Sequence, residues 1–165
     1  MFAKYRISEA LMVVYKLFWD EFSSWYLEMI KPAYGSPIDR ESYETTLKFF
    51  DTLLKMLHPF MPFITEELWQ ALEERKEGES IMCEKLTIEA PANGEQTLCS
   101  EIENVKQIVS NIRMVRSQKN LSPKEPLTLY AISNNYAKFD EVVCKMANLQ
   151  AIEIKSENLP MLHHS

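Results

Sequence analysis

The sequence has 165 residues, of which 46% are apolar and 25% charged, with a net charge of −6. This length suits one medium-sized domain with a small appendage, and the apolar content excludes a disordered chain. The longest fully apolar run spans residues 10–15, far short of the roughly 18 residues that a membrane span needs. No export signal opens the sequence, so we expect a cytoplasmic protein without membrane contact. An acidic balance argues against a generic nucleic-acid binder, because such domains are usually basic.

The composition also limits the chemistry that the chain can perform. Three glycines leave little material for a glycine-rich phosphate loop. Cys83, Cys99 and Cys144 are widely spaced and form no pair typical of a metal site. We therefore expect reduced cysteines that serve as small apolar residues, and no metal ion or cofactor in this chain.

Apolar residues recur every three or four positions along four segments, which predicts four helices. The first covers residues 5–30 and stops before Pro32. The second begins at a cap on Asp39 or Ser42 and ends at His58. Thr65 is the expected cap of the third, and the fourth covers residues 97–119.

The pattern changes after the fourth helix. Residues 127–132 and 151–155 alternate as strands do, and they enclose a helical stretch at residues 136–148. A single βαβ crossover hardly forms a stable sheet, so this unit looks incomplete. The expected fold is mainly α: an antiparallel bundle of about four helices over residues 1–120, followed by a small truncated α/β appendage over residues 121–165.

Several segments together resemble one family. HPFMPFITEELW at residues 58–69 strongly resembles the start of the third bundle helix in the anticodon-binding domain of class I aminoacyl-tRNA synthetases. FSSWYLEMIKP at 22–32, ESIM at 79–82 and IRMVR at 112–116 with NLSP at 120–123 resemble the valyl-tRNA synthetase forms of that domain. One departure is the missing Trp-Pro pair after ESIM, which leaves residues 83–90 without a counterpart.

The resemblance implies that a full-length enzyme ligates valine to its tRNA, with ATP and Mg in its catalytic part. The nucleotide-binding sequences of that part, His-x-Gly-His and Lys-Met-Ser-Lys-Ser, are absent here. This stretch is therefore expected to hold no catalytic residue, and editing of mischarged threonine also lies elsewhere. Its expected partners are the anticodon stem-loop of valine tRNA and the rest of the synthetase chain, in a monomer.

Two groups of residues are candidate tRNA contacts. Exposed aromatic side chains beside basic ones can stack and hydrogen-bond unpaired bases. The candidates of this kind lie in and around the first helix: Lys4, Arg6, Phe22, Trp25, Tyr26 and Lys31. Two adjacent apolar stripes run along the first predicted helix, and Phe22 belongs to both. Of the three aromatics it is therefore the one most expected in the core.

The second group is a basic run with no acidic residue between positions 111 and 124. Release of counterions from RNA favours such local positive charge even on an acidic protein. The competing interpretation is a basic helix end, favoured by the helix dipole. The run consists of Arg113, Arg116, Lys119 and Lys124.

Other residues have structural interpretations. His58 precedes a proline at a helix end, where it is expected to bond the chain rather than to catalyse. Phe60, Met61, Phe63 and Trp69 are expected in the core. Rival identities are the same domain of an isoleucyl-, leucyl- or methionyl-tRNA synthetase, or a helical protein-interaction module. A stand-alone enzyme lacks any convergent acid, base, nucleophile or metal set.

Overall fold

A computed structural model describes residues 6–88, 95–132 and 137–155. The described chain is mostly helical, which confirms the mainly α class. It forms two compact units, residues 1–90 and 91–165, and each is described by itself. The fourth predicted helix thus belongs to the same unit as the two strands, a different division from the domain boundary expected after residue 120.

The first unit begins with one continuous helical rod. It consists of α1 (Ile7–Lys16), the π-helical η2 (Leu17–Tyr26) and α2 (Leu27–Ile30). In the π-helical part the chain winds more loosely, so that the Leu27 N–H bonds to the Phe22 carbonyl five residues back. The rod ends where Lys31 takes an extended conformation ahead of Pro32, as the sequence predicts.

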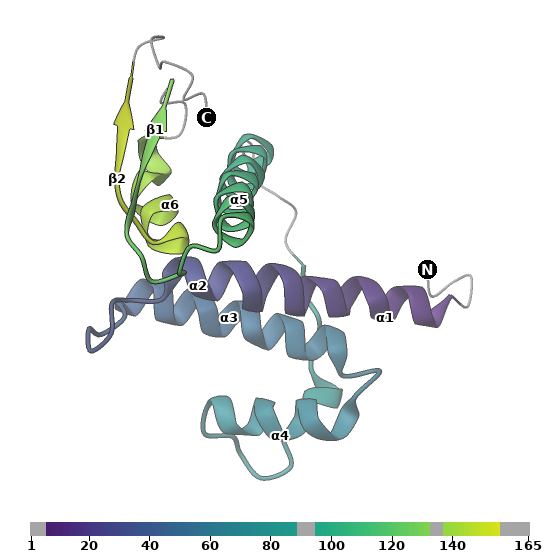
Figure 1. The fold of residues 1–165 in the computed structure, drawn as a ribbon. Helices are drawn as coiled ribbons and strands as arrows, with labels where there is room; N and C mark the ends of the chain where they lie inside the picture. Colours follow the sequence, from purple (N-terminus) through teal and green to yellow (C-terminus); the bar gives the residue numbers. More distant parts are fainter. Residues whose placement is uncertain (1–5, 89–94, 133–136, 156–165) are drawn as a thin grey trace. The chain divides into compact units, whose positions relative to one another are not determined.

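Helix α3 (Arg40–Leu57) returns beside the rod and forms a helical hairpin with it (Figure 1). Asp39 is its cap, because the Asp39 carboxylate accepts a hydrogen bond from the Ser42 N–H at 2.8 Å. Aromatic rings hold the pair together: Phe22 stacks on Phe50 at 6.0 Å, and Tyr26 meets Phe49 edge-on at 5.4 Å.

Helix α4 (Pro62–Leu72) starts four residues earlier than the sequence predicts. Pro62 occupies its first turn, where a missing N–H costs nothing. The prediction of Thr65 as the helix cap is wrong. Thr65 is buried inside the helix, and its hydroxyl bonds to the Met61 carbonyl and to His58 Nδ1, both at 2.8 Å. His58 therefore has the structural role expected of it.

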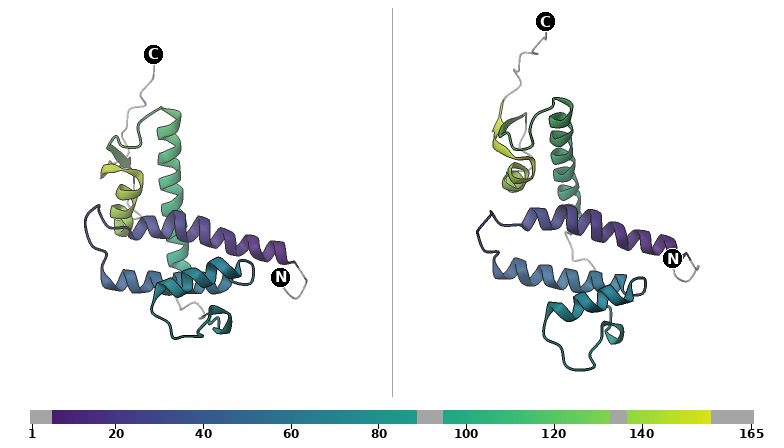
Figure 2. Two further views of the ribbon diagram at one scale, coloured as in Figure 1. Left: turned by 90° about the horizontal axis from the view of Figure 1, so that it is seen from below. Right: turned by 60° about the horizontal axis from the view of Figure 1, so that its bottom comes forward.

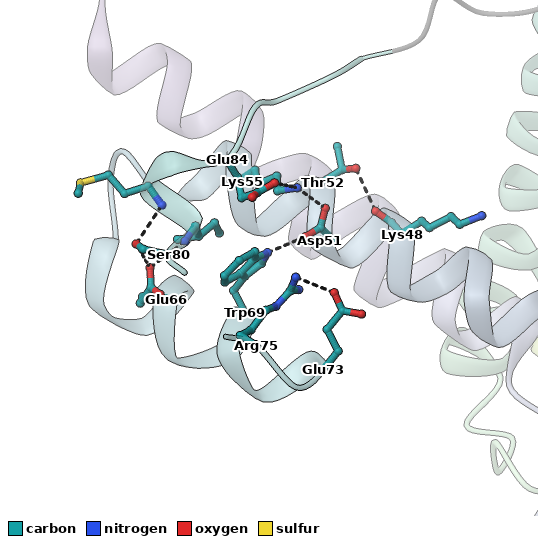
Figure 3. A network of polar contacts seen from close by, with 12 residues as sticks. Lys48, Asp51, Thr52, Lys55, Glu66, Trp69, Glu73, Arg75, Ser80 and Glu84 are labelled. Atoms are coloured by element: carbon teal, nitrogen blue, oxygen red, sulfur yellow. Dashed lines mark hydrogen bonds and ion pairs between the residues drawn. The ribbon is translucent and has the colours of Figure 1, made fainter. Parts of the chain in front are cut away.

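Trp69 is the centre of the first unit. Its side chain is 1% exposed and packs with Leu54 and Ile81. The indole Nε1–H donates to Asp51 Oδ1 at 2.8 Å, and the guanidinium of Arg75 lies 3.7 Å from the ring centre (Figure 3). Trp69 thus joins α3, α4 and the segment after α4 at one point.

Glu66 fixes the segment that follows α4. Its carboxylate accepts hydrogen bonds from the Ser80 hydroxyl at 2.8 Å and from the Ile81 N–H at 3.1 Å (Figure 3). These bonds hold the 3-10 turn η3 (Ile81–Cys83), in a region where the sequence predicts irregular or extended chain. Hydrogen bonds from Gln70 and then Ser80 lower the pKa of Glu66 below its ordinary value of 4.5.

Not every apolar side chain of this unit is buried. Trp69 lies in the core, as the sequence predicts. Met61 and Phe63 are exposed instead, and Phe63 is 91% exposed. They lie at the start of α4, where the helix face turns away from α3. Met12, Tyr15 and Trp19 on the rod are also exposed.

The second unit combines a long helix with a parallel two-stranded sheet (Figures 1 and 2). Helix α5 (Glu95–Gln118) packs on α6 (Asp140–Ala147), which follows the 3-10 turn η4 (Ala137–Phe139). Strands β1 (Leu127–Ala131) and β2 (Leu149–Ile154) pair in parallel, and η4 and α6 lie between them in the sequence. The predicted βαβ order is confirmed. The core of the unit comes from α5 and α6: Val105, Val109, Val143 and Ala147.

Replacing Trp69 tests the centre of the first unit. Trp69→Ala removes a buried indole and leaves the Asp51 carboxylate without its donor, so we expect a loss of about 3–5 kcal/mol of unfolding free energy. Urea denaturation followed by circular dichroism measures it. Phe63→Ala is the control and should change stability by no more than about 0.5 kcal/mol. Equal effects of the two substitutions would contradict the placement of Trp69.

The lowered pKa of Glu66 gives a pH dependence. A carboxyl group with a folded-state pKa below its unfolded value contributes stability above the unfolded value and loses it as the pH falls through the folded one. We therefore expect the unfolding free energy of the natural chain to fall between pH 6 and pH 3 by more than that of Glu66→Gln. Denaturation series at pH 6, 5, 4 and 3 measure the difference. Parallel curves for the two chains would show that Glu66 contributes nothing to the acid lability.

Candidate nucleic-acid interface

Arg116 is the most constrained of the candidate contact residues. It is 5% exposed, and Nη1 of its guanidinium donates to the carbonyls of Ser122 at 3.0 Å and Glu125 at 2.8 Å. Nη2 donates to the carbonyls of Ala147 at 3.1 Å and Asn148 at 2.8 Å. All four acceptors are backbone groups of the same unit. The prediction that Arg116 contacts tRNA directly is therefore wrong, because its donors are directed into the protein and water scarcely reaches it.

Arg113 has a related position but keeps its exposure. Its Nη2 donates to the carbonyl of Met146 at 2.9 Å, one residue before the carbonyls that Arg116 holds. The last carbonyls of a helix have no partner within it and carry partial negative charge. The two arginines, three residues apart on α5, thus cap the carboxyl end of α6. The arginines meet the end of α6, whereas the competing interpretation from the sequence placed them at the end of their own helix, α5.

Lys119 and Lys124 lie on the turn that leaves α5, and both are exposed. The helix closes with Asn120 in the left-handed region at φ 54° and with the Leu121 N–H bonded to the Arg116 carbonyl at 2.9 Å. Within the described residues neither lysine makes an ion pair. The turn also borders a hollow of about 540 Å³, whose lining includes Arg113, Arg116, Ser117, Asn120 and Ser122. The basic run therefore separates into two arginines that bond to carbonyls at the end of α6, of which Arg113 stays exposed, and two exposed lysines.

The aromatic candidates of the first unit also separate. Phe22 is 8% exposed and sits between the rings of Phe18, Tyr26 and Phe50. It is therefore a core residue, and the prediction that it touches RNA is wrong. Tyr26 is half-buried, with its hydroxyl 3.2 Å from the hydroxyl of Thr46.

Trp25 is half-buried as well and follows Phe22 by three residues on the π-helical part of the rod. By residue type it stays a candidate for stacking on an unpaired base.

The basic candidates near the rod are at its two ends. Lys31 is exposed at the end of α2, and its ammonium lies 3.9 Å from the carboxylate of Glu28. Arg6 is exposed ahead of α1 and forms an ion pair with Glu9. Exposed pairs of this kind are worth little and can open for another partner. Lys4 lies outside the described residues.

The described part of the chain offers no other site chemistry of note. No group of three or more His, Cys, Asp or Glu side chains within it could hold a metal ion. Among the helices described, none has the length and apolar character to cross a membrane.

Comparison with known proteins decides the family. Residues 1–131 match the family described as the anticodon-binding domain of tRNA ligase. The chain belongs to this family. That match extends from the first unit through α5 and its turn to the end of β1.

Proteins named valine–tRNA ligase match nearly the whole chain. The relative from Phocaeicola vulgatus is 59% identical over 154 residues, which are 93% of this chain and 17% of that protein. The relative from Bacteroides thetaiotaomicron is 56% identical over 157 residues, 93% of this chain and 18% of that protein. A relative from Christiangramia forsetii is 40% identical over 92% of this chain. The chain thus spans less than a fifth of the length of these relatives.

The sequence shows the basic run, but it does not show that the arginines and the lysines of this run have different surroundings. The spacing of Arg113 and Arg116 places both on one face of α5. What they meet there depends on α6, which is about 30 residues further along the chain. The one sequence signal was that two arginines of the run lie inside the helix, whereas its two lysines lie at and after its end.

The role of Arg116 can be tested by removing its donors. Arg116→Leu leaves four backbone carbonyls without their partner, so we expect a loss of about 3 kcal/mol or more of unfolding free energy. Hydrogen exchange should show faster exchange of the α6 and β2 amides. Arg113→Leu is the matched control and should cost less, because its guanidinium is exposed. A smaller loss for Arg116→Leu than for Arg113→Leu would contradict the assignment.

Proposed function

We propose that this chain is the anticodon-binding part of a valine–tRNA ligase and holds the anticodon stem-loop of valine tRNA. The family match and the name shared by the relatives support this function. Ligation of valine, with ATP and Mg, then belongs to the remainder of the whole protein, which works in the cytoplasm as a monomer.

The fold proposed for the working domain is an antiparallel bundle of four helices. The hairpin of the rod and α3, with α4 packed on α3, supplies three of them. α5 is proposed as the fourth, with the domain boundary after residue 120 and the βαβ unit as an appendage.

The proposed RNA contacts are the candidates whose side chains stay accessible. Trp25 supplies an aromatic face for an unpaired base. Exposed cations supply contacts to phosphates or base edges, whose affinity comes from counterion release. These cations are Arg6, Lys31, Arg113, Lys119 and Lys124. Lys4 joins them as a proposal from the sequence.

Two rivals remain distinguishable. The same family also serves tRNA ligases for other amino acids, but the relatives named here are valine ligases at 40–59% identity over more than nine-tenths of the chain. A helical protein-interaction module would use the same exposed aromatic and basic side chains on a partner helix. Binding of such a partner would depend little on salt, whereas RNA binding weakens steeply as salt rises.

A binding titration tests the proposal. We expect the chain to bind a hairpin RNA with the valine tRNA anticodon stem-loop more tightly than the same hairpin with its anticodon changed. Fluorescence anisotropy at 50, 100 and 200 mM salt measures both the preference and the salt slope. Equal affinity for the two hairpins, with circular dichroism showing a folded chain, would contradict anticodon binding. A flat salt dependence would favour the protein-interaction module.

A further inference from the structure

We infer that the turn after α5, residues 119–124, is a docking surface for RNA backbone phosphates, and that Arg116 is the positioning residue that holds this turn. The inference rests on the proposed function and adds two things to it. It names the chemical group that the turn receives, and it gives Arg116 a role in binding without contact to the ligand.

Hydrogen bonds to backbone carbonyls attach the turn to the rest of its unit. Arg116 donates to the carbonyls of Ser122 and Glu125 on one side, and to those of Ala147 and Asn148 on the other. The side chain of Asn148 adds a bond from Nδ2 to the carbonyl of Pro123 at 3.0 Å. The turn is therefore fastened to the junction of α6 and β2 from both directions.

These hydrogen bonds decide which positive charges of the basic run are available to bind RNA. Arg113 and Arg116 bond to carbonyls at the end of α6, where partial negative charge collects, so part of their positive charge is offset there. Lys119 and Lys124 face solvent and make no ion pair in the described part of the chain. The one carboxylate beside them in the sequence is that of Glu125. The turn therefore carries two exposed lysines on a backbone held by hydrogen bonds, against one carboxylate nearby in the sequence.

Ammonium groups of this kind match phosphate rather than base edges. Lysine is a flexible point charge that suits a phosphate group, whereas arginine offers a planar pair of donors better suited to bidentate contact with a base edge. Both arginines already use guanidinium donors within the protein. The lining of the hollow of about 540 Å³ combines Ser117, Asn120 and Ser122, residues whose polar groups can bond phosphate oxygens and ribose hydroxyls, with the apolar Leu121 and Pro123.

Arg116 favours RNA binding because it holds the turn in place beforehand, which lowers the conformational entropy lost on binding. An eight-residue connection between α5 and β1 loses conformational entropy when RNA orders it, and a turn that is already fixed loses less. Lysine at this position keeps the charge but cannot reach four carbonyls in two directions. Arg116→Lys therefore separates positioning from charge.

The first experiment replaces the two lysines in the full chain. Lys119→Ala with Lys124→Ala should lower the affinity for the valine anticodon hairpin roughly five- to tenfold for each lost phosphate contact at 0.1 M salt. The magnitude of the salt slope should fall by about 1 per lysine. Lys76→Ala with Lys85→Ala is the charge-matched control, taken from exposed positions of the first unit. Equal effects of the two pairs would overturn the phosphate surface.

The second experiment is a double-mutant cycle. Arg116→Lys should weaken hairpin binding several-fold in the natural chain and have no further effect when Lys119 and Lys124 are already alanine. An equal loss in both backgrounds would overturn the positioning role. If Arg116→Lys unfolds the second unit, Asn148→Gly serves instead, because it removes the bond to Pro123 and keeps the positive φ of 50°.

The two proposals fail in different ways. If the unaltered, folded chain binds neither the valine hairpin nor its anticodon variant, both the proposed function and this inference are overturned. If the chain binds the hairpin but the lysine pair has no effect, the inference alone is overturned.

Discussion

A buried donor must find an acceptor, and in the first unit this requirement falls on the indole N–H of Trp69. The ring is almost fully buried, and its donor is paired by a single carboxylate oxygen of Asp51 on α3. The other oxygen of Asp51 holds Lys55 at 2.8 Å, and Arg75 covers the ring (Figure 3). The bond therefore fixes how α4 sits on α3, and with it the hairpin that carries Trp25 and Lys31.

The same requirement shapes the second unit through a different side chain. Arg116 brings five donors into a site with little water. Its two terminal nitrogens donate to four backbone carbonyls, whereas its buried Nε has no partner among the described residues. Its partners come from the turn after α5 and from the end of α6, so one side chain sets the position of both. A charged residue thus does here what Trp69 does in the first unit: it joins segments that are distant in the sequence.

The residues that carry the family resemblance are largely packing residues. In the segment at 58–69, His58 and Thr65 bond to each other, and Glu66 and Trp69 bond to other parts of the first unit. ESIM at 79–82 matters because Ser80 and Ile81 complete the Glu66 site. These motifs therefore identify the family through its fold, and the surface that meets RNA has to be argued separately from exposure and charge.

The helices, their order and the βαβ element follow from the sequence because apolar spacing, prolines and the Asp39 cap act over a few residues. The basic run could also be found there, as could the core position of Phe22 from its place on two stripes. The sequence could not show that Phe63 is exposed or that Thr65 is inside its helix, because both depend on where α4 meets α3. Nor could it divide the basic run: whether an arginine faces RNA or the carbonyls of α6 is decided by contacts across about 30 residues of chain. Local spacing determined which residues share a face, and only the tertiary structure determined what that face meets.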